Sequence, residues 1–176
     1  MTVFKGRARK LGDDVNTDYI ISSKRKKDTL DEQTLKRYLL ESLDPSFAGS
    51  VRDGDIIVAG ANFGCGSAME VAATVILAAG IRVVLARSFS RSFYRNAINN
   101  GLVPIECDIA DIAEGDMMSI SMDASAVRVT NDLTGARDLR PPLSGIAGEI
   151  LAAGGLVPYL RRTGRFIQPP AHANGP

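Results

Sequence analysis

The chain has 176 residues, which is enough for one domain with a hydrophobic core. Its 21 lysine and arginine residues nearly balance its 20 aspartate and glutamate residues, so the formal net charge is +1. Such a balance gives no overall positive field, and we expect neither nucleic acid nor a membrane as a partner.

The first part of the chain predicts a strand, a turn, a basic loop and a helix. Residues 3–11 alternate in character, as in a strand, and a turn follows at residues 12–14. Residues 22–28 are predicted to form a short basic loop. Leucines recur through residues 31–43 at helical spacing, so we expect an amphipathic helix there, ended by Pro45.

The middle of the chain alternates between strands and helices. The apolar run at residues 56–59 predicts a buried strand, and two further strands are predicted at residues 81–86 and 102–107. Two helices are predicted between them, each ended by a glycine, at residues 69–79 and 89–100. This succession indicates crossover connections and an at least partly parallel sheet, so the predicted fold class is α/β.

After residue 110 the pattern changes. Two short strands are predicted around a turn, at residues 116–122 and 126–130, followed by a polar connection at 131–142 and a helix at 143–153. Residues 156–162 continue that helix or form a final turn. With no repeat and no linker in the sequence, we expect a single domain over residues 1–163 and a disordered tail over 164–176.

Few residues are available for metal or triad chemistry. The two cysteines, Cys65 and Cys107, are too few for a structural zinc or an iron–sulfur cluster, and we interpret them as reduced thiols. The single histidine, His172, lies in the polar tail, which argues against a Ser-His-Asp triad or a histidine metal site. The N-terminus lacks an apolar stretch and no segment reaches the ~20 apolar residues of a membrane helix, so we expect a cytoplasmic protein.

The glycine-rich loop at residues 60–67 is the sharpest local feature. It follows a predicted strand and opens a predicted helix, and its glycines allow the backbone to turn tightly and approach a ligand. Ser67 would lie near the helix N-terminus, where N–H groups and the helix dipole favour an anion. The alternative is that Ser67 is only an N-cap. The loop lacks the complete spacing of a nucleotide-binding motif, which argues against that function.

Four motifs in order carry a resemblance to a known family: Asn16-Thr17-Asp18, GDIIVAG at 54–60, NFGCGS at 62–67 and FYRNAINNG at 93–101. Together they resemble the small subunits of 3-isopropylmalate dehydratase, in the aconitase superfamily, over roughly residues 5–162. The resemblance implies the swivelling β/β/α domain of aconitases. It also implies a separate large subunit that carries a [4Fe–4S] cluster, with no cofactor in this chain.

The activity implied by this resemblance is that of a heterodimeric hydro-lyase of leucine biosynthesis. Water is removed from a small hydroxy dicarboxylic acid and returned in the other regiochemistry. Ser67 matches the family serine that removes a proton next to a carboxylate, and glycine-loop N–H groups suit a stabilised alkoxide. Asp18 matches the family's active-site aspartate, for which an Asx turn or cap is the alternative.

The sequence departs from the family pattern directly after Ser67. The usual Gly-Ser-Ser-Arg is here Gly66-Ser67-Ala68-Met69, and we assign Gly66, Ala68 and Met69 to substrate binding. In the family the arginine grips a substrate carboxylate, whereas Met69 forms no ion pair and offers a soft apolar wall.

A run of cations offers a replacement for the missing arginine. We assign Lys24, Arg25 and Lys27 to contact with the substrate anion; a solvated basic loop is an equal alternative. Two explanations of the departures stay open. One is a retuned enzyme acting on homoaconitate or a methylated malate, and the other is a non-catalytic anion-binding or scaffold paralogue. The retained Ser67 and Asp18 favour an enzyme.

Overall fold

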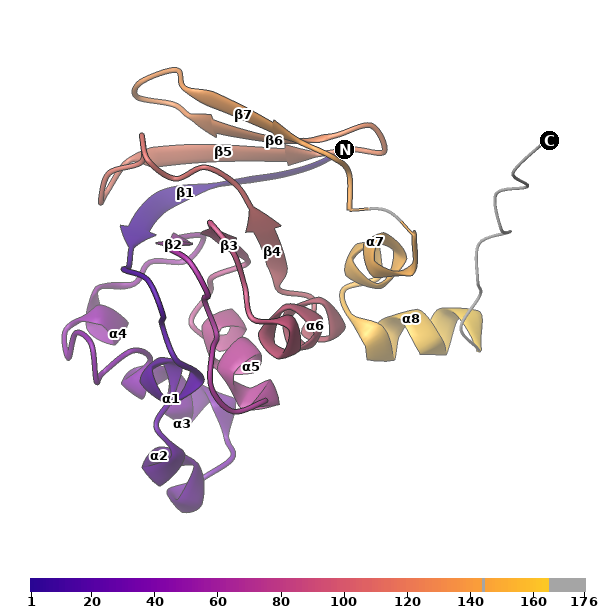
Figure 1. Ribbon diagram of the computed structural model, residues 1–176. Coiled ribbons are helices and arrows are strands. Elements are labelled where there is room, and N and C mark those ends of the chain that lie inside the picture. The colour runs from indigo at the N-terminus through magenta and orange to yellow at the C-terminus, as the bar shows by residue number, and fades with distance from the viewer. Residues whose placement is uncertain (144, 165–176) are drawn as a thin grey trace.

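The computed structural model describes residues 1–143 and 145–164. Seven strands form one mixed sheet in the order β4-β3-β2-β1-β5-β6-β7 (Figure 1). The strands are β1 (Thr2–Lys10), β2 (Ile56–Ala59), β3 (Val83–Ala86), β4 (Val103–Glu106), β5 (Met117–Met122), β6 (Val127–Asn131) and β7 (Arg137–Arg140). Strands β1 to β4 run parallel, and β5 to β7 continue the sheet from β1 in antiparallel pairs. The α/β prediction with a partly parallel sheet is confirmed.

The helices between the parallel strands pack on one side of them, and two more helices follow β7. In chain order the helices are α1 (Thr17–Ile20), α2 (Ser23–Asp28), α3 (Glu32–Leu35), the 3-10 turn η1 (Lys36–Tyr38), α4 (Phe47–Ser50), α5 (Glu70–Ala78), α6 (Arg91–Asn100), α7 (Gly145–Ala152) and α8 (Leu156–Thr163). Figure 1 shows α1 to α5 below the parallel strands and β5 to β7 above them. Among the described residues, no helix is long and apolar enough to cross a membrane.

The central parallel strands are apolar throughout because both of their faces are covered. In β2, Ile57 and Ala59 pack among the helices, whereas Ile56 and Val58 face a second core formed with β5 and β6. All four residues are buried. The alternation of strand side chains therefore serves two cores, and the sheet curls so that its antiparallel half covers the second one.

Three sequence predictions of secondary structure are wrong. The basic segment expected to be a loop is the helix α2, whose N-cap Ser22 accepts the N–H of Lys24. The helix expected over residues 31–43 stops after α3 and η1, because Leu40 adopts a left-handed conformation and its N–H bonds to the carbonyl of Ile20. The connection expected over residues 131–142 contains β7, whose polar sequence becomes a strand by pairing with β6.

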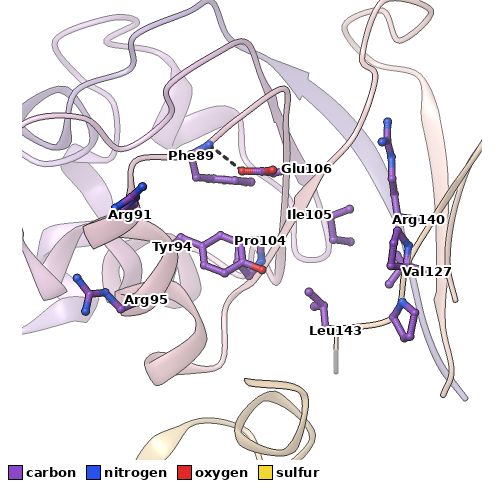
Figure 2. Close-up of a pocket in the computed structure, with 12 residues that line it drawn as sticks. Phe89, Arg91, Tyr94, Arg95, Pro104, Ile105, Glu106, Val127, Arg140 and Leu143 are labelled. Carbon is purple, nitrogen blue, oxygen red and sulfur yellow. Dashed lines mark hydrogen bonds between the residues drawn. The ribbon is translucent and has the colours of Figure 1, made fainter. Parts of the chain in front are cut away.

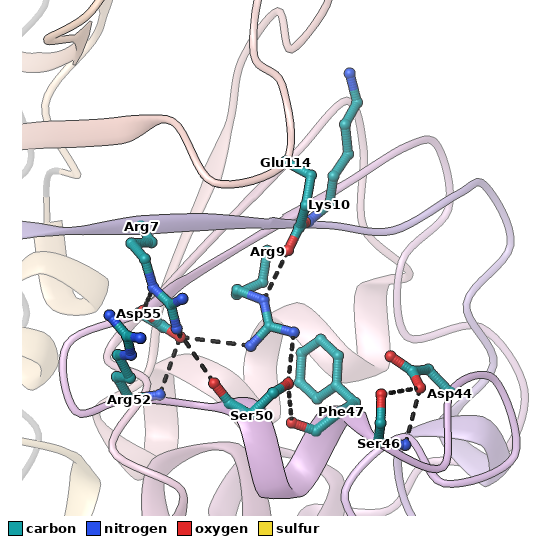
Figure 3. A network of polar contacts seen from close by, with 10 residues as sticks. All are labelled: Arg7, Arg9, Lys10, Asp44, Ser46, Phe47, Ser50, Arg52, Asp55 and Glu114. Atoms are coloured by element: carbon teal, nitrogen blue, oxygen red, sulfur yellow. Dashed lines mark hydrogen bonds and ion pairs between the residues drawn. The ribbon is translucent and has the colours of Figure 1, made fainter.

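A network of charged side chains fastens β1 to the segment that leads into β2 (Figure 3). Asp55 accepts hydrogen bonds from Arg7 Nε at 3.0 Å and Arg7 Nη2 at 2.7 Å, and from the N–H of Arg52 at 3.0 Å. Arg9 lies over the Phe47 ring, 4.5 Å from its centroid, and donates to Ser50 Oγ and to Glu114. These contacts fix the register between the first two strands, from which the site loops extend.

The C-terminal helices pack against α6, and Leu151 of α7 also packs against the core of the sheet. Ile98 of α6, Ile150 of α7 and Tyr159 of α8 form a small buried cluster. Gly154 and Gly155, both with positive φ, separate the last two helices. Residues 156–162 therefore neither continue α7 nor form only a final turn; they belong to the separate helix α8, and that prediction is also wrong. Apart from Gly164, the tail expected over 164–176 lies outside the described residues, and the domain boundary at residue 163 stays a prediction.

Candidate functional site

The predicted site residues lie at the carboxyl edge of the parallel strands. Because β1, β2 and β3 are parallel neighbours, the loops that follow them meet at one edge of the sheet. Backbone hydrogen bonds join these loops directly. Gly64 N–H donates to the carbonyl of Val15 at 2.8 Å, and Phe63 N–H donates to the carbonyl of Ser88 at 3.0 Å.

Two glycines allow the loop after β2 to pack this closely. Gly64 has φ +76°, and a Cβ there would come within 2.2 Å of the Phe93 ring. Gly66 has φ +92°, and a Cβ there would come within 2.5 Å of Asn16 Oδ1. Both conformations are strained for other residues, so glycine is required twice by space and by backbone. Gly66 therefore packs over the cap of α1, beside the segment that carries Asp18.

Ser67 is exposed at the end of this loop. Its hydroxyl has no hydrogen-bond partner among the described residues, so no side chain in that part of the chain activates it as a base. The N-cap of α5 is Met69, without a side-chain hydrogen bond, so the N-cap interpretation of Ser67 is wrong. The N–H groups of Glu70 and Val71 begin that helix without a hydrogen-bond acceptor in the described residues. They give the local positive potential that favours an anion.

Asp18 is half-buried at the start of α1. The turn there is made by Asn16, whose side chain accepts the N–H of Asp18 at 2.8 Å. The carboxylate of Asp18 is therefore not the capping group. Its Oδ1 accepts the hydroxyl of Ser23 at 2.6 Å, and its Oδ2 has no hydrogen bond within the described residues. One carboxylate oxygen is left for a ligand or a partner.

Thr17, directly before Asp18, connects the Asp18 segment to the Ser67 loop, and the sequence alone assigned it no role. Thr17 is 1% exposed, and its Oγ1 donates to the carbonyl of Ser67 at 2.9 Å. Its N–H donates to the carbonyl of Cys65 at 2.8 Å. The only signal in the sequence was its position inside the Asn16-Thr17-Asp18 motif.

The substrate-binding predictions fall on different environments. Gly66 and Ala68 are exposed, whereas Met69 is 9% exposed and belongs to the core among the helices. The sulfur of Met69 is contacted by the ammonium group of Lys26, which comes from α2. The structure thus places the ammonium group of Lys26 beside Met69.

The predicted cations of α2 are not equivalent. Arg25 donates two hydrogen bonds of 2.9 Å to Glu41 and lies over the Tyr38 ring, 3.9 Å from its centroid. Its hydrogen bond to Glu41 raises the pKa of Arg25 and lowers the pKa of Glu41. Lys24 and Lys27 are exposed. Arg25 therefore holds α2 in place, and its contact with the substrate stays a prediction without support from this geometry.

A well-formed cavity elsewhere in the described part of the chain contains none of these residues. It measures about 740 Å³ and lies between α6, β4 and the segment after β7 (Figure 2). Phe89, Tyr94 and Ile105 form apolar walls, and Glu106 accepts the N–H of Phe89 at 3.4 Å. The predicted site is instead an open surface, since Ser67 and its neighbours Gly66 and Ala68 are all exposed.

The cysteines lie apart in structure and environment. Cys65 is half-buried in the glycine loop, and Cys107 is buried after β4; both are free. Burial raises the pKa of Cys107 to about 12, so its thiol is not poised for chemistry. Within residues 1–143 and 145–164, no three histidine, cysteine, aspartate or glutamate side chains gather as a metal site would require.

Comparison with known proteins identifies the family of this chain. The model of the aconitase C-terminal domain matches residues 16–110, which contain every predicted site residue, and the chain belongs to this family. Over nearly its whole length it is similar to small subunits of two-part enzymes. It is 45% identical to the methanogen homoaconitase small subunit of Methanocaldococcus jannaschii, covering 91% of this chain and 92% of that protein.

Two further relatives carry the dehydratase name. The 3-isopropylmalate dehydratase small subunit of Desulfovibrio desulfuricans is 46% identical, covering 90% of this chain and 95% of that protein. The crystal structure of a 3-isopropylmalate dehydratase from Methanocaldococcus jannaschii has a TM-score of 0.87 at 43% identity. It covers 93% of this chain and 96% of that one. The resemblance inferred from four motifs is confirmed.

Proposed function

We propose that this chain is the small subunit of a two-subunit hydro-lyase that interconverts 2- and 3-isopropylmalate by dehydration and rehydration. Similarity to small subunits of that name supports the assignment. The observation that carries it is the exposed Ser67, whose hydroxyl is free within the described residues and whose loop is bonded to the Asp18 segment. A cytoplasmic location is part of this proposal, supported by two free cysteines.

In the proposed reaction, Ser67 removes the proton from the carbon next to a substrate carboxylate. A serine hydroxyl is a weak base, and it acts only where its alkoxide is stabilised. The first N–H groups of α5, at Glu70 and Val71, are suited to that stabilisation. Asp18, with one free carboxylate oxygen, orients the substrate hydroxyl or a water molecule beside Ser67. After rotation of the unsaturated intermediate, the same groups serve the return of water.

The anion contact is assigned to α2, with Lys26 as its principal member. The half-buried Lys26 reaches Met69, next to Ser67, while Lys24 and Lys27 lie exposed on the same helix. An ammonium group held against an apolar wall pairs with a carboxylate more strongly than one in free solvent. Lys26 therefore takes over the task of the arginine that Met69 replaces.

The described residues do not form a ligand set for an iron–sulfur cluster. Cys65 is half-buried and Cys107 is buried, and no group of three possible ligands includes them. On this proposal the Lewis acidity required for the departing hydroxyl comes from a [4Fe–4S] cluster held by the large subunit. The open surface around Ser67 then forms one wall of a cleft that the large subunit closes.

Reconstitution tests the function. The chain is combined anaerobically with a large subunit of 3-isopropylmalate dehydratase, and hydration of isopropylmaleate is followed by the loss of its conjugated absorbance. We expect neither chain to turn over alone. Ser67→Ala should lower kcat by about a hundredfold or more, as expected for loss of a positioned base. Ser121→Ala, on β5 in the antiparallel half of the sheet, makes the same atomic change away from the loop and should leave kcat unaltered.

The outcomes separate enzyme from scaffold. A stable complex without turnover of any hydroxy diacid would support the non-catalytic paralogue. An active complex in which Ser67→Ala matches Ser121→Ala would remove Ser67 from the reaction while keeping the enzyme class.

Homoaconitate is the second candidate substrate, favoured by the 45% identity to a homoaconitase small subunit and by the cations of α2. It carries one more carboxylate than isopropylmalate, so it gains more from a cationic wall. A substrate panel with the reconstituted pair decides between them. Lys26→Met should raise KM for the preferred acid about tenfold, whereas Lys5→Met, on exposed β1 surface, should not. An unchanged KM in Lys26→Met would mean that α2 is a solvated helix without a role in substrate binding.

A further inference from the structure

We infer that Thr17 is a positioning residue that holds the Ser67 loop against the Asp18 segment, an inference whose catalytic part rests on the proposed function. Thr17 touches neither a reacting atom nor a ligand site. Its two hydrogen bonds instead decide where Ser67 stands relative to Asp18 and to the first turn of α5.

The loop before α5 has few other attachments. Gly64 is anchored on both sides, by its N–H to Val15 and by the hydroxyl of Ser90 on its carbonyl at 2.6 Å. Beyond that anchor, residues 65–68 are held to the body of the described structure by two hydrogen bonds. Both come from Thr17: its N–H to Cys65 and its hydroxyl to Ser67.

The environment of Thr17 makes these bonds persistent. The residue is 1% exposed, so water competes poorly for its hydroxyl, and its own backbone is fixed by the cap of Asn16 and the bond from Ile21 N–H to its carbonyl. Ser67, in contrast, is exposed and contributes no hydrogen bond from its side chain within the described residues. The position of Ser67 is therefore fixed by Thr17, which lies outside the Ser67 loop.

The side-chain bond is the part that substitution can remove alone. Thr17→Val keeps the shape and the backbone bond to Cys65 but loses the hydroxyl, whereas Thr17→Ser keeps the hydroxyl and loses a methyl group. Thr130→Val, at a half-buried position of β6, is the matched control for the same exchange elsewhere.

The first measurement needs no enzymatic activity. Cys65 lies inside the tethered loop, and the reaction rate of its thiol with a disulfide reagent in the folded full-length chain reports how often the loop opens. Cys107 is buried and stays silent. Loss of one hydrogen bond should raise the Cys65 rate about fivefold in Thr17→Val. Thr17→Ser and Thr130→Val should stay near the wild-type rate, with circular dichroism confirming that all variants are folded.

The second measurement uses the reconstituted holoenzyme. Thr17→Val should lower kcat about tenfold at unchanged KM, and Thr17→Ser should restore most of it. Added to Ser67→Ala, the Thr17→Val change should cost nothing further, because the group that it positions is gone. A Cys65 rate equal to wild type in Thr17→Val would overturn the tether. Faster labelling with unaltered kcat would overturn the catalytic part, and a complex inactive with every acid would fail the proposed function while leaving the labelling result to decide the tether.

Discussion

The buried carboxylate of Asp55 offers the sharpest test of how the scaffold is held. Asp55 is 2% exposed and accepts two hydrogen bonds from Arg7 and one from the N–H of Arg52, with Arg9 Nη1 at 3.5 Å. Asp55→Asn keeps the size of the side chain, removes its charge and points an amide donor at groups that are themselves donors.

The size of the effect follows from the partners. Removing one member of a buried ion pair costs about 3–5 kcal/mol, because the other charge is left unpaired. The Arg7 side chain is 28% exposed, so water recovers part of its loss, whereas that of Arg9 is 9% exposed and recovers little. We expect Asp55→Asn to lower the free energy of unfolding by about 3 kcal/mol. For a chain of this length that corresponds to a decrease in Tm of roughly 10 °C.

The assay is urea unfolding at neutral pH, followed by circular dichroism. Asp53→Asn is the matched control, since Asp53 is exposed in the same turn and makes no ion pair among the described residues, so its loss should stay within about 0.5 kcal/mol. Equal losses in the two variants would refute the claim that the network around Asp55 holds β1 to β2.

The pH dependence of stability gives an independent check that the charged Asp55 carboxylate stabilises the fold. Burial raises the pKa of Asp55, but the hydrogen bonds and charge of Arg7 and the N–H of Arg52 outweigh it, and the net pKa is lowered. A carboxylate with a lowered pKa stabilises the folded state fully above its ordinary value and loses that contribution as pH falls through the lowered one. The stability gap between wild type and Asp55→Asn should therefore narrow in acid.

Three further predictions concern the site and its surroundings. Gly66→Ala should destabilise the fold by about 2 kcal/mol in urea unfolding, because it forces a left-handed alanine into contact with Asn16; a neutral result would show that the loop relaxes freely. The hydrogen bond from Arg25 lowers the pKa of Glu41, so the urea midpoints of wild type and Glu41→Gln should differ at neutral pH and converge as pH falls through that lowered value. A pH-independent gap would mean that the pair contributes packing alone. Cys107, with its pKa raised to about 12, should resist a disulfide reagent at mildly alkaline pH until urea unfolds the chain, and early labelling of both thiols would contradict its burial.

Much of the fold could be predicted because its signals are local. Residues 56–59 and 83–86 are apolar runs long enough for a strand and too short for a helix, and the glycines at the ends of α5 and α6 mark where each helix stops. β7 could not be predicted in the same way. Its Arg-Asp-Leu-Arg sequence presents two exposed residues and two half-buried ones at the sheet edge, and it becomes a strand only because β6 offers a free row of backbone groups.

The candidate site was likewise only partly predictable from the sequence. The motif that contains Ser67 and the motif that contains Asp18 were both recognisable, because a tight turn restricts residue choice at each position. The lysine nearest the site was not predictable. The sequence prediction chose Lys24, Arg25 and Lys27 and left Lys26 out, and only the folding of the run into α2 turns Arg25 toward Glu41 and Lys26 toward Met69.

By itself the sequence determined the alternation of strands and helices, the glycine loop and the family. These depend on side-chain periodicity and backbone freedom, which are properties of short segments. The tertiary structure alone decided that Thr17 and Ser67, 50 positions apart, are hydrogen-bonded, and that the site is an open surface rather than the cavity beside α6 and β4. The reason is the parallel pairing of β1 with β2, which brings the carboxyl ends of two distant segments to one edge of the sheet.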